Sequence, residues 1–143
     1  MRISYPVAPG DFSNAGKVSS TIKSLLKQLN ISAKDVKRMV VAIYEAEVNM
    51  VAHSYGGQIV CTLEADKAIV EAIDTGPGIP DLDLAMTEGW STATPEVREM
   101  GFGAGMGLPN IKKHTDDLAI ETGKDRPTHI NMLFRLEGAT DGS

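Results

Sequence analysis

The sequence predicts an α+β two-layer sandwich, a mixed, mostly antiparallel sheet covered on one face by about three helices. Three observations lead to this prediction. Two segments near the amino terminus repeat apolar residues at helical spacing, short strand-like segments follow them, and a glycine-rich stretch interrupts the second half of the chain. With 143 residues the chain has the length of one domain, which we take to span 1–143.

The first three elements are expected to be a strand and two helices. Residues 2–7 partly alternate and predict a strand, in which Pro6 favours an edge position. Apolar residues then recur at helical spacing from Val18 to Leu29, and Asp11 is a candidate cap for this first helix. Ser32 is the candidate cap of a second helix that runs to about Ala52.

The second half of the chain is expected to consist mainly of strands. A hairpin is predicted because only three residues separate two strand-like runs. A long irregular stretch follows, and loops of this length inside a compact domain are usually functional. The expected elements are strands at 58–64 and 68–74, an irregular stretch at 75–107 with a lid at about 79–107, a helix at 108–115, strands at 118–122 and 128–136, and a frayed tail at 137–143.

Composition excludes several classes of function. The formal net charge is −5 and the basic residues are scattered, which argues against nucleic acid as a partner. Cys61 is the single cysteine, so no internal disulfide can form, and we expect it to be a small buried hydrophobe in a cytoplasmic protein. No run of apolar residues is long enough to span a membrane, so no membrane partner is expected.

The first candidate constellation combines Glu45 and Asn49 on the second helix. Their spacing of four places both side chains on one helical face, together with small alanines that would leave room for a ligand. An amide oxygen suits Mg²⁺, and a carboxylate one turn away could act as a base. The alternative is a pair of solvated polar residues. Glu47 projects onto the apolar stripe of the same helix, so it must be paired or partly exposed, or it shares the role of Glu45.

The second candidate constellation follows the strand at 68–74. Asp74 ends the strand, and Gly76, Gly78 and Ile79 form a glycine-proline turn directly after it. A carboxylate at a strand end can accept a hydrogen bond from an exocyclic amine such as that of adenine. The glycines allow the backbone to approach a ring closely. The alternative is an ordinary turn with no ligand.

The third candidate constellation is a run in which glycine recurs at every second position. Backbone amides of such a loop can surround phosphates, and the helix that follows offers its positive amino terminus. The pattern is neither a Walker loop nor a dinucleotide fingerprint, and its alternative is a flexible linker. Trp90, in the preceding stretch, would pack the lid or anchor a partner. The run comprises Gly101, Gly103, Gly105, Met106, Gly107 and Leu108.

In this order, the three constellations resemble the motifs of the GHKL ATPase superfamily, which has the Bergerat fold and includes gyrase, Hsp90, histidine kinases and MutL. Glu45 and Asn49 resemble its N-box, Asp74 to Gly78 its first glycine box, and 101–108 its second. Thr128 resembles the threonine that supports the adenine-binding aspartate. The resemblance covers about residues 12–136. We expect a stand-alone domain, and a domain of this length is most similar to the anti-sigma factors and switch kinases of the superfamily.

This resemblance implies a mechanism. ATP would bind with Mg²⁺ held by Asn49, with adenine read by Asp74 and Thr128, and with phosphates cradled by the glycines. Glu45 would deprotonate a serine hydroxyl of a small antagonist protein, so the chain would be a serine-protein kinase. The alternative is an ATP-gated binding module that sequesters a partner protein with little catalysis.

The resemblance also leaves the partners open. A sigma factor is a second candidate partner, and a homodimer is compatible with the family. Relatives that bind sigma factors often carry an arginine just before the final glycines, where this chain has Gly103 and Ala104. That departure argues against a sigma factor more than against ATP.

Overall fold

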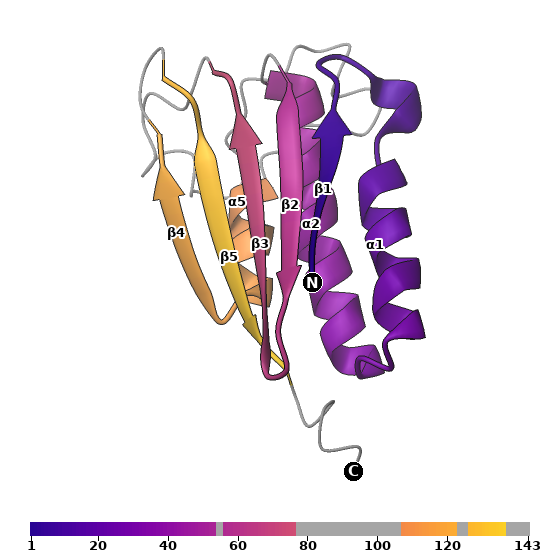
Figure 1. Ribbon diagram of the computed structural model, residues 1–143. Coiled ribbons are helices and arrows are strands. Elements are labelled where there is room, and N and C mark those ends of the chain that lie inside the picture. Colours follow the sequence, from indigo (N-terminus) through magenta and orange to yellow (C-terminus); the bar gives the residue numbers. More distant parts are fainter. Residues whose placement is uncertain (54–55, 77–106, 123–125, 137–143) are drawn as a thin grey trace.

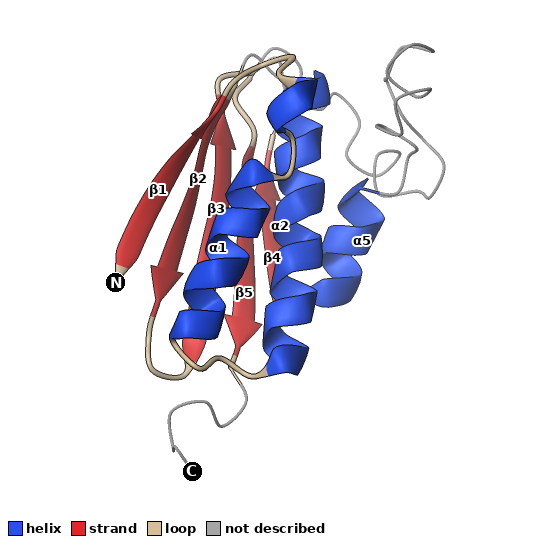
Figure 2. Ribbon diagram, turned by 90° about the vertical axis from the view of Figure 1, so that its right-hand side faces the viewer, coloured by secondary structure: helices blue, strands red, loops and turns tan. Residues whose placement is uncertain are grey.

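The computed structural model describes residues 1–53, 56–76, 107–122 and 126–136. Among these residues, five strands form one sheet, and three α-helices lie side by side on a single face of it (Figures 1 and 2). The predicted α+β two-layer arrangement is therefore confirmed. In chain order the elements are β1 (Arg2–Val7), the 3₁₀ turn η1 (Phe12–Asn14), α1 (Lys17–Gln28), α2 (Ala33–His53), β2 (Gly57–Leu63), β3 (Lys67–Asp74), α5 (Gly107–His114), β4 (Asp117–Glu121) and β5 (His129–Arg135).

The strands follow the order β1-β2-β3-β5-β4 in the sheet. All four pairings among the described strands are antiparallel. The prediction of a mixed, mostly antiparallel sheet included a parallel pairing, and none is found among these strands. β1 lies at one edge, where the missing N–H of Pro6 costs least. The expected hairpin between β2 and β3 is also confirmed, with Leu63 paired to Ala68 next to the turn.

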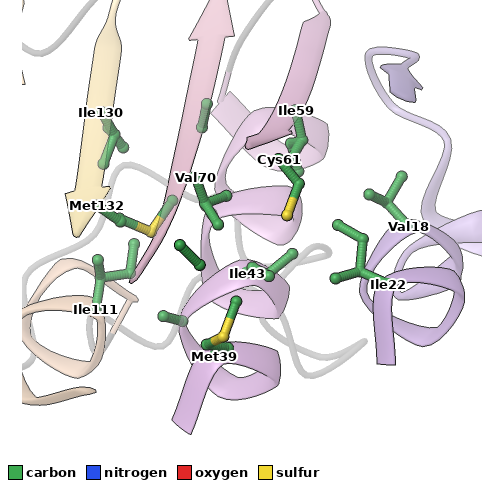
Figure 3. Packing of buried hydrophobic residues seen from close by; sticks show 14 of the residues in the cluster. Val18, Ile22, Met39, Ile43, Ile59, Cys61, Val70, Ile111, Ile130 and Met132 are labelled. Atoms are coloured by element: carbon green, nitrogen blue, oxygen red, sulfur yellow. The ribbon is translucent and has the colours of Figure 1, made fainter. Parts of the chain in front are cut away.

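The core lies between the sheet and the helices because the strands alternate. On β3 every second residue is buried, and the same face of β5 contributes Ile130, Met132 and Phe134. Figure 3 shows side chains of the sheet, among them Val70 and Met132, facing those of the helices, such as Ile111. The opposite face of the sheet carries no helix among the described residues and is more polar. There His129 Nε2 lies 2.9 Å from Glu71 Oε2 on the neighbouring strand.

Helix α1 is capped by a residue of α2 and not by Asp11. The Asp11 carboxylate accepts hydrogen bonds from the side chains of Ser13 and Asn14, so the prediction that it caps the helix is wrong. Gly16 precedes α1 and has no side chain to offer. The carboxylate of Glu47 takes this role, since its two oxygens accept the first amides of α1, those of Val18 and Ser19, each at 3.1 Å.

The start of α2 is fixed by Ser32 and by an arginine one turn into the helix. The Ser32 hydroxyl accepts the amide of Asp35 at 3.2 Å, which confirms the predicted cap. Arg38 binds the buried carboxylate of Asp35, the carboxylate of Asp116 and the carbonyl of Arg135. One guanidinium therefore joins α2 to the residue just before β4 and to the end of β5.

Cys61 is buried in the core, as expected from the sequence. Burial raises the pKa of its thiol from 9.0 to about 11, because the thiolate would lose its hydration. The thiol is thus unreactive near neutral pH. None of the helices in the described residues has the length and hydropathy that a membrane crossing requires.

Replacing Glu47 should destabilise the fold strongly. The Glu47→Ala variant leaves two buried amides without an acceptor, so we expect its free energy of unfolding to fall by about 2–4 kcal/mol. Glu47→Gln keeps one acceptor and should lose less. Denaturant titration with circular dichroism measures both, with the exposed Glu121→Ala as control. A loss no larger than that of the control would contradict the capping role.

Asp116 should make stability depend on pH in the acid range. Burial opposes its ionisation, but the amide of Arg135 and the guanidinium of Arg38 outweigh this and hold its pKa below 3.8. Its contribution is therefore present above pH 3.8 and is lost as the pH falls through the lower folded-state value. We expect Asp116→Asn to be less stable than wild type at pH 7, with the difference shrinking toward pH 3. A difference that stays constant in urea titrations, or that Asp117→Asn reproduces, would contradict this.

Candidate functional site

Of the candidate residues that the structure describes, Asn49, Asp74, Gly76 and Thr128 lie at the end of the molecule where α2 ends, β3 ends and β5 begins (Figure 1). Gly57 shows how tightly these segments meet. A Cβ atom at this position would lie 2.0 Å from the carbonyl oxygen of Ile73 and 2.8 Å from the side chain of Met50. Only glycine fits there, and this close approach brings the last turns of α2 against Asp74, which pairs with Gly57 in the sheet.

Asp74 is a buried carboxylate held in one orientation by backbone amides. Its Oδ1 accepts the amide of Gly76 at 2.9 Å and the amide of Thr128 at 2.8 Å. Gly76 can reach it because its φ of 114° is a conformation that L-residues rarely adopt. Both of these hydrogen bonds end on Oδ1, and neither involves Oδ2. Oδ2 is the oxygen suited to receive a donor from a ligand.

Thr128 supports Asp74 from β5. Two hydrogen bonds join it to Asp74: its amide donates to the side-chain Oδ1, and its carbonyl accepts the Asp74 amide at 3.0 Å. Its hydroxyl lies 2.7 Å from that of Thr122, just beyond the end of β4. The predicted neighbourhood of Thr128 and Asp74 is therefore observed, and it extends to a second threonine that the sequence did not single out.

Glu45 is half-buried on the side of α2 that faces α5. Its Oε2 accepts a hydrogen bond of 2.8 Å from the side-chain amide of Asn110 on α5. α2 and α5 pack against each other along this side (Figure 2). Asn110 was missed from the sequence because it lies 65 positions from Glu45, and only the three-dimensional packing brings the two together.

Asn49 lies one helical turn beyond Glu45 and is also half-buried. Of the three alanines expected to leave room for a ligand, Ala42 and Ala46 are fully buried in the core, so these two serve close packing, whereas Ala52 is half-buried. Among the described residues no group of three or more His, Cys, Asp and Glu side chains could hold a metal.

The helix predicted after the glycine run is α5. It begins at Gly107, and Leu108 is buried against the core. Pro109 lies in its first turn, where the missing N–H costs nothing. The start of α5 is thus described, whereas the segment before it is not. The candidate residues Gly78, Ile79, Gly101, Gly103, Gly105 and Met106, as well as Trp90, lie outside the described residues.

Glu47 has a structural position that separates it from the candidate site. It lies between Glu45 and Asn49 in sequence, but its carboxylate is buried against α1 and accepts two amides there. Because the carboxylate is 2% exposed and both of its oxygens accept amides of α1, it is directed away from a reactant at the candidate site. The alternative in which Glu47 shares the role of Glu45 therefore has no support in the geometry.

Comparison with known proteins gives one family and a consistent set of relatives. Residues 8–134 match the family model described as "Histidine kinase-like ATPase domain". The serine/threonine-protein kinase RsbT of Bacillus subtilis is 30% identical over 115 residues, which cover 78% of this chain and 80% of the relative. The anti-sigma F factor of Thermoanaerobacter sp. is 27% identical over 124 residues, which cover 83% of each chain.

A solved structure supports the fold independently. The RsbU and RsbW domains of Rv1364c from Mycobacterium tuberculosis superpose with a TM-score of 0.64 over 95% of this chain, at 17% identity. This chain spans about a third, 32%, of that longer protein. At this identity the likeness is evidence for the fold alone.

Proposed function

Because the chain belongs to the family of histidine kinase-like ATPase domains, we propose that it is an ATP-dependent serine-protein kinase of the anti-sigma type. Its relatives are named as a serine/threonine-protein kinase and as anti-sigma F factors. The family description implies use of ATP.

The carboxylate of Asp74 is the observation that carries the proposal. A buried carboxylate is costly unless it is fully hydrogen-bonded, and here Oδ1 takes two amides. In this proposal Oδ2 accepts the exocyclic amine of adenine. Guanine presents an acceptor at the corresponding position, so the same carboxylate would repel it. Asp74 would thus provide both affinity and selectivity for ATP.

Asn49 fits the requirements of a magnesium ligand. Mg²⁺ usually keeps several waters and takes only one or two protein oxygens besides those of phosphates, so a site with one amide and no carboxylate cluster is suitable. Bound Mg²⁺ would neutralise the phosphate charge. The amino-terminal end of α5 adds a positive partial charge. The glycines of 101–105, outside the described residues, are assigned to phosphate binding by their sequence alone.

Glu45 would serve as the base. The serine hydroxyl of the partner gives its proton to Glu45 and attacks the γ-phosphorus, the new O–P bond forms, and the bond to the β-phosphate breaks so that ADP leaves. Asn110 occupies Oε2 of Glu45 at 2.8 Å, and this leaves Oε1 for the hydroxyl. Because α5 directly follows the glycine run, Asn110 would link the phosphate-binding segment to the base.

The protein substrate is proposed by chemistry and not by name. We expect a small antagonist protein with an accessible serine, because the relatives are anti-sigma factors and a serine/threonine kinase. A sigma factor is a second candidate partner. Phosphate transfer from ATP to such a partner would take place in the cytoplasm, and a homodimer of this chain is compatible with the proposal.

The nucleotide site can be tested by calorimetry with Mg-ATP. We expect wild type to bind, and Asp74→Asn to bind about 10–100-fold more weakly, since the new amide directs N–H groups at the adenine amine while its oxygen still accepts the two backbone amides. Asn49→Ala should lose the dependence on Mg²⁺. The exposed Gln28→Ala is the control. If wild type fails to bind Mg-ATP, the proposed site is refuted.

Phosphate transfer can be tested with γ-labelled ATP and a soluble extract of the source cells, followed by identification of phosphoserine. We expect Glu45→Gln to lower kcat by about 10²–10⁴-fold. Asn110→Ala should lower kcat by about tenfold without changing the affinity for ATP, because it positions the base and touches no nucleotide.

A double-mutant cycle separates positioning from a general structural effect. If Asn110 acts through Glu45, Asn110→Ala should cost nothing further in the Glu45→Gln background. The exposed Lys112→Ala on the same helix is the control. Equal losses in both backgrounds would overturn the assignment of Asn110. ATP binding without any phosphoserine would favour the alternative, an ATP-gated binding module.

A further inference from the structure

The two long helices form a groove that the proposed ATP site does not use. It lies between the second half of α1 and the first turns of α2, and it encloses about 490 Å³. Figure 2 shows these two helices side by side. The connection between the two helices closes one end. Residues that matter for its chemistry are Lys23, Lys27, Ile31, Val36, Lys37 and Val40.

The groove combines an apolar floor with a basic rim. Val36 is buried, and Ile31 and Val40 are half-buried. Lys23, Lys27 and Lys37 are exposed around them, so their ammonium groups can reach a bound molecule while their stems extend the apolar surface. This surface suits an occupant that has aliphatic groups on one side and carboxylates beside them.

Charge is strongly concentrated around this groove. Residues 16–41 contain six basic side chains and one acidic side chain, a net charge of +5 in a protein whose overall charge is −5. The single acid, Asp35, is buried and paired with Arg38. It therefore does not offset the lysines at the rim. A partner of complementary charge must be acidic.

The apolar surface continues beyond the groove along α2. Tyr44, which is 40% exposed, lies one turn beyond Val40 on the same face of this helix. From Ala33 to Tyr44 the helix rises about 16 Å, the length of roughly three turns of a second helix.

We propose that this groove binds an acidic amphipathic α-helix of a partner protein. Aliphatic residues of the partner at helical spacing pack on Val36 and Val40, and glutamates or aspartates on both sides pair with the three lysines. A helix packed between two others matches the ridges and grooves of a helical layer. This docking surface needs neither nucleotide nor phosphate transfer, so it stands apart from the proposed kinase activity.

The test uses a fluorescent, hydrocarbon-stapled peptide of about 15 residues with leucines at helical spacing and glutamates beside them. Fluorescence anisotropy should show binding that weakens as salt is raised. The triple variant Lys23→Glu, Lys27→Glu, Lys37→Glu should bind at least about tenfold more weakly. A control that reverses three exposed basic residues elsewhere, Arg2→Glu, Lys112→Glu and Arg126→Glu, should change the affinity less than about twofold.

Thermal unfolding and Mg-ATP calorimetry of both triple variants show whether folding and the nucleotide site are intact, so failure of this proposal is distinguishable from failure of the kinase proposal. Equal binding of the peptide to the groove variant, or equal binding of a peptide with lysines in place of glutamates, would overturn it. Lysine-dependent binding to phosphatidylglycerol vesicles without peptide binding would replace the partner helix by a lipid surface. Self-association lost in the groove variant, again without peptide binding, would replace it by a second copy.

Discussion

The hydrogen bonds that Glu47 accepts from the start of α1 set the orientation of the central helix α2. Its carboxylate must face the amides of Val18 and Ser19, because a buried carboxylate without donors would cost several kcal/mol. Once Glu47 faces α1, helical geometry directs Glu45 and Asn49, two residues away on either side, to the opposite side of α2. That side faces α5 and the candidate site. A structural contact on one side of α2 therefore fixes the orientation of the candidate site residues on the other side.

Buried polar groups have a second use at the edge of the site. Asp74 and Thr128 are both buried, and they bind each other through main chain and side chain at the meeting point of two strands. Such a pair is rigid because either group alone would be left unsatisfied. A ligand that binds Oδ2 therefore meets a carboxylate already oriented, and little ordering remains to be done on binding.

Local sequence patterns predicted the helices and strands, whereas side-chain contacts between residues distant in sequence could not be predicted from them. Apolar periodicity predicted the bounds of α2 and of the hairpin to within a residue or two. Asp74 was chosen as a candidate site residue because a carboxylate before a glycine turn is a local signal. Asn110 and the cap of α1 were missed because each depends on a partner distant in sequence. Asp11 was chosen as a cap by its residue type, but its carboxylate binds the side chains of its own turn.

The uneven distribution of charge between the two layers has a kinetic consequence. Lysines dominate the outer side of α1 and the start of α2, whereas on the bare face of the sheet three acidic residues are balanced by three basic ones, Arg2, Lys67 and Arg135. An acidic molecule that diffuses toward the protein is therefore attracted to the lysines of α1 and α2 before any contact forms. Encounters would be oriented in advance, and their rate would fall with ionic strength over a Debye length of about 8 Å in the cell.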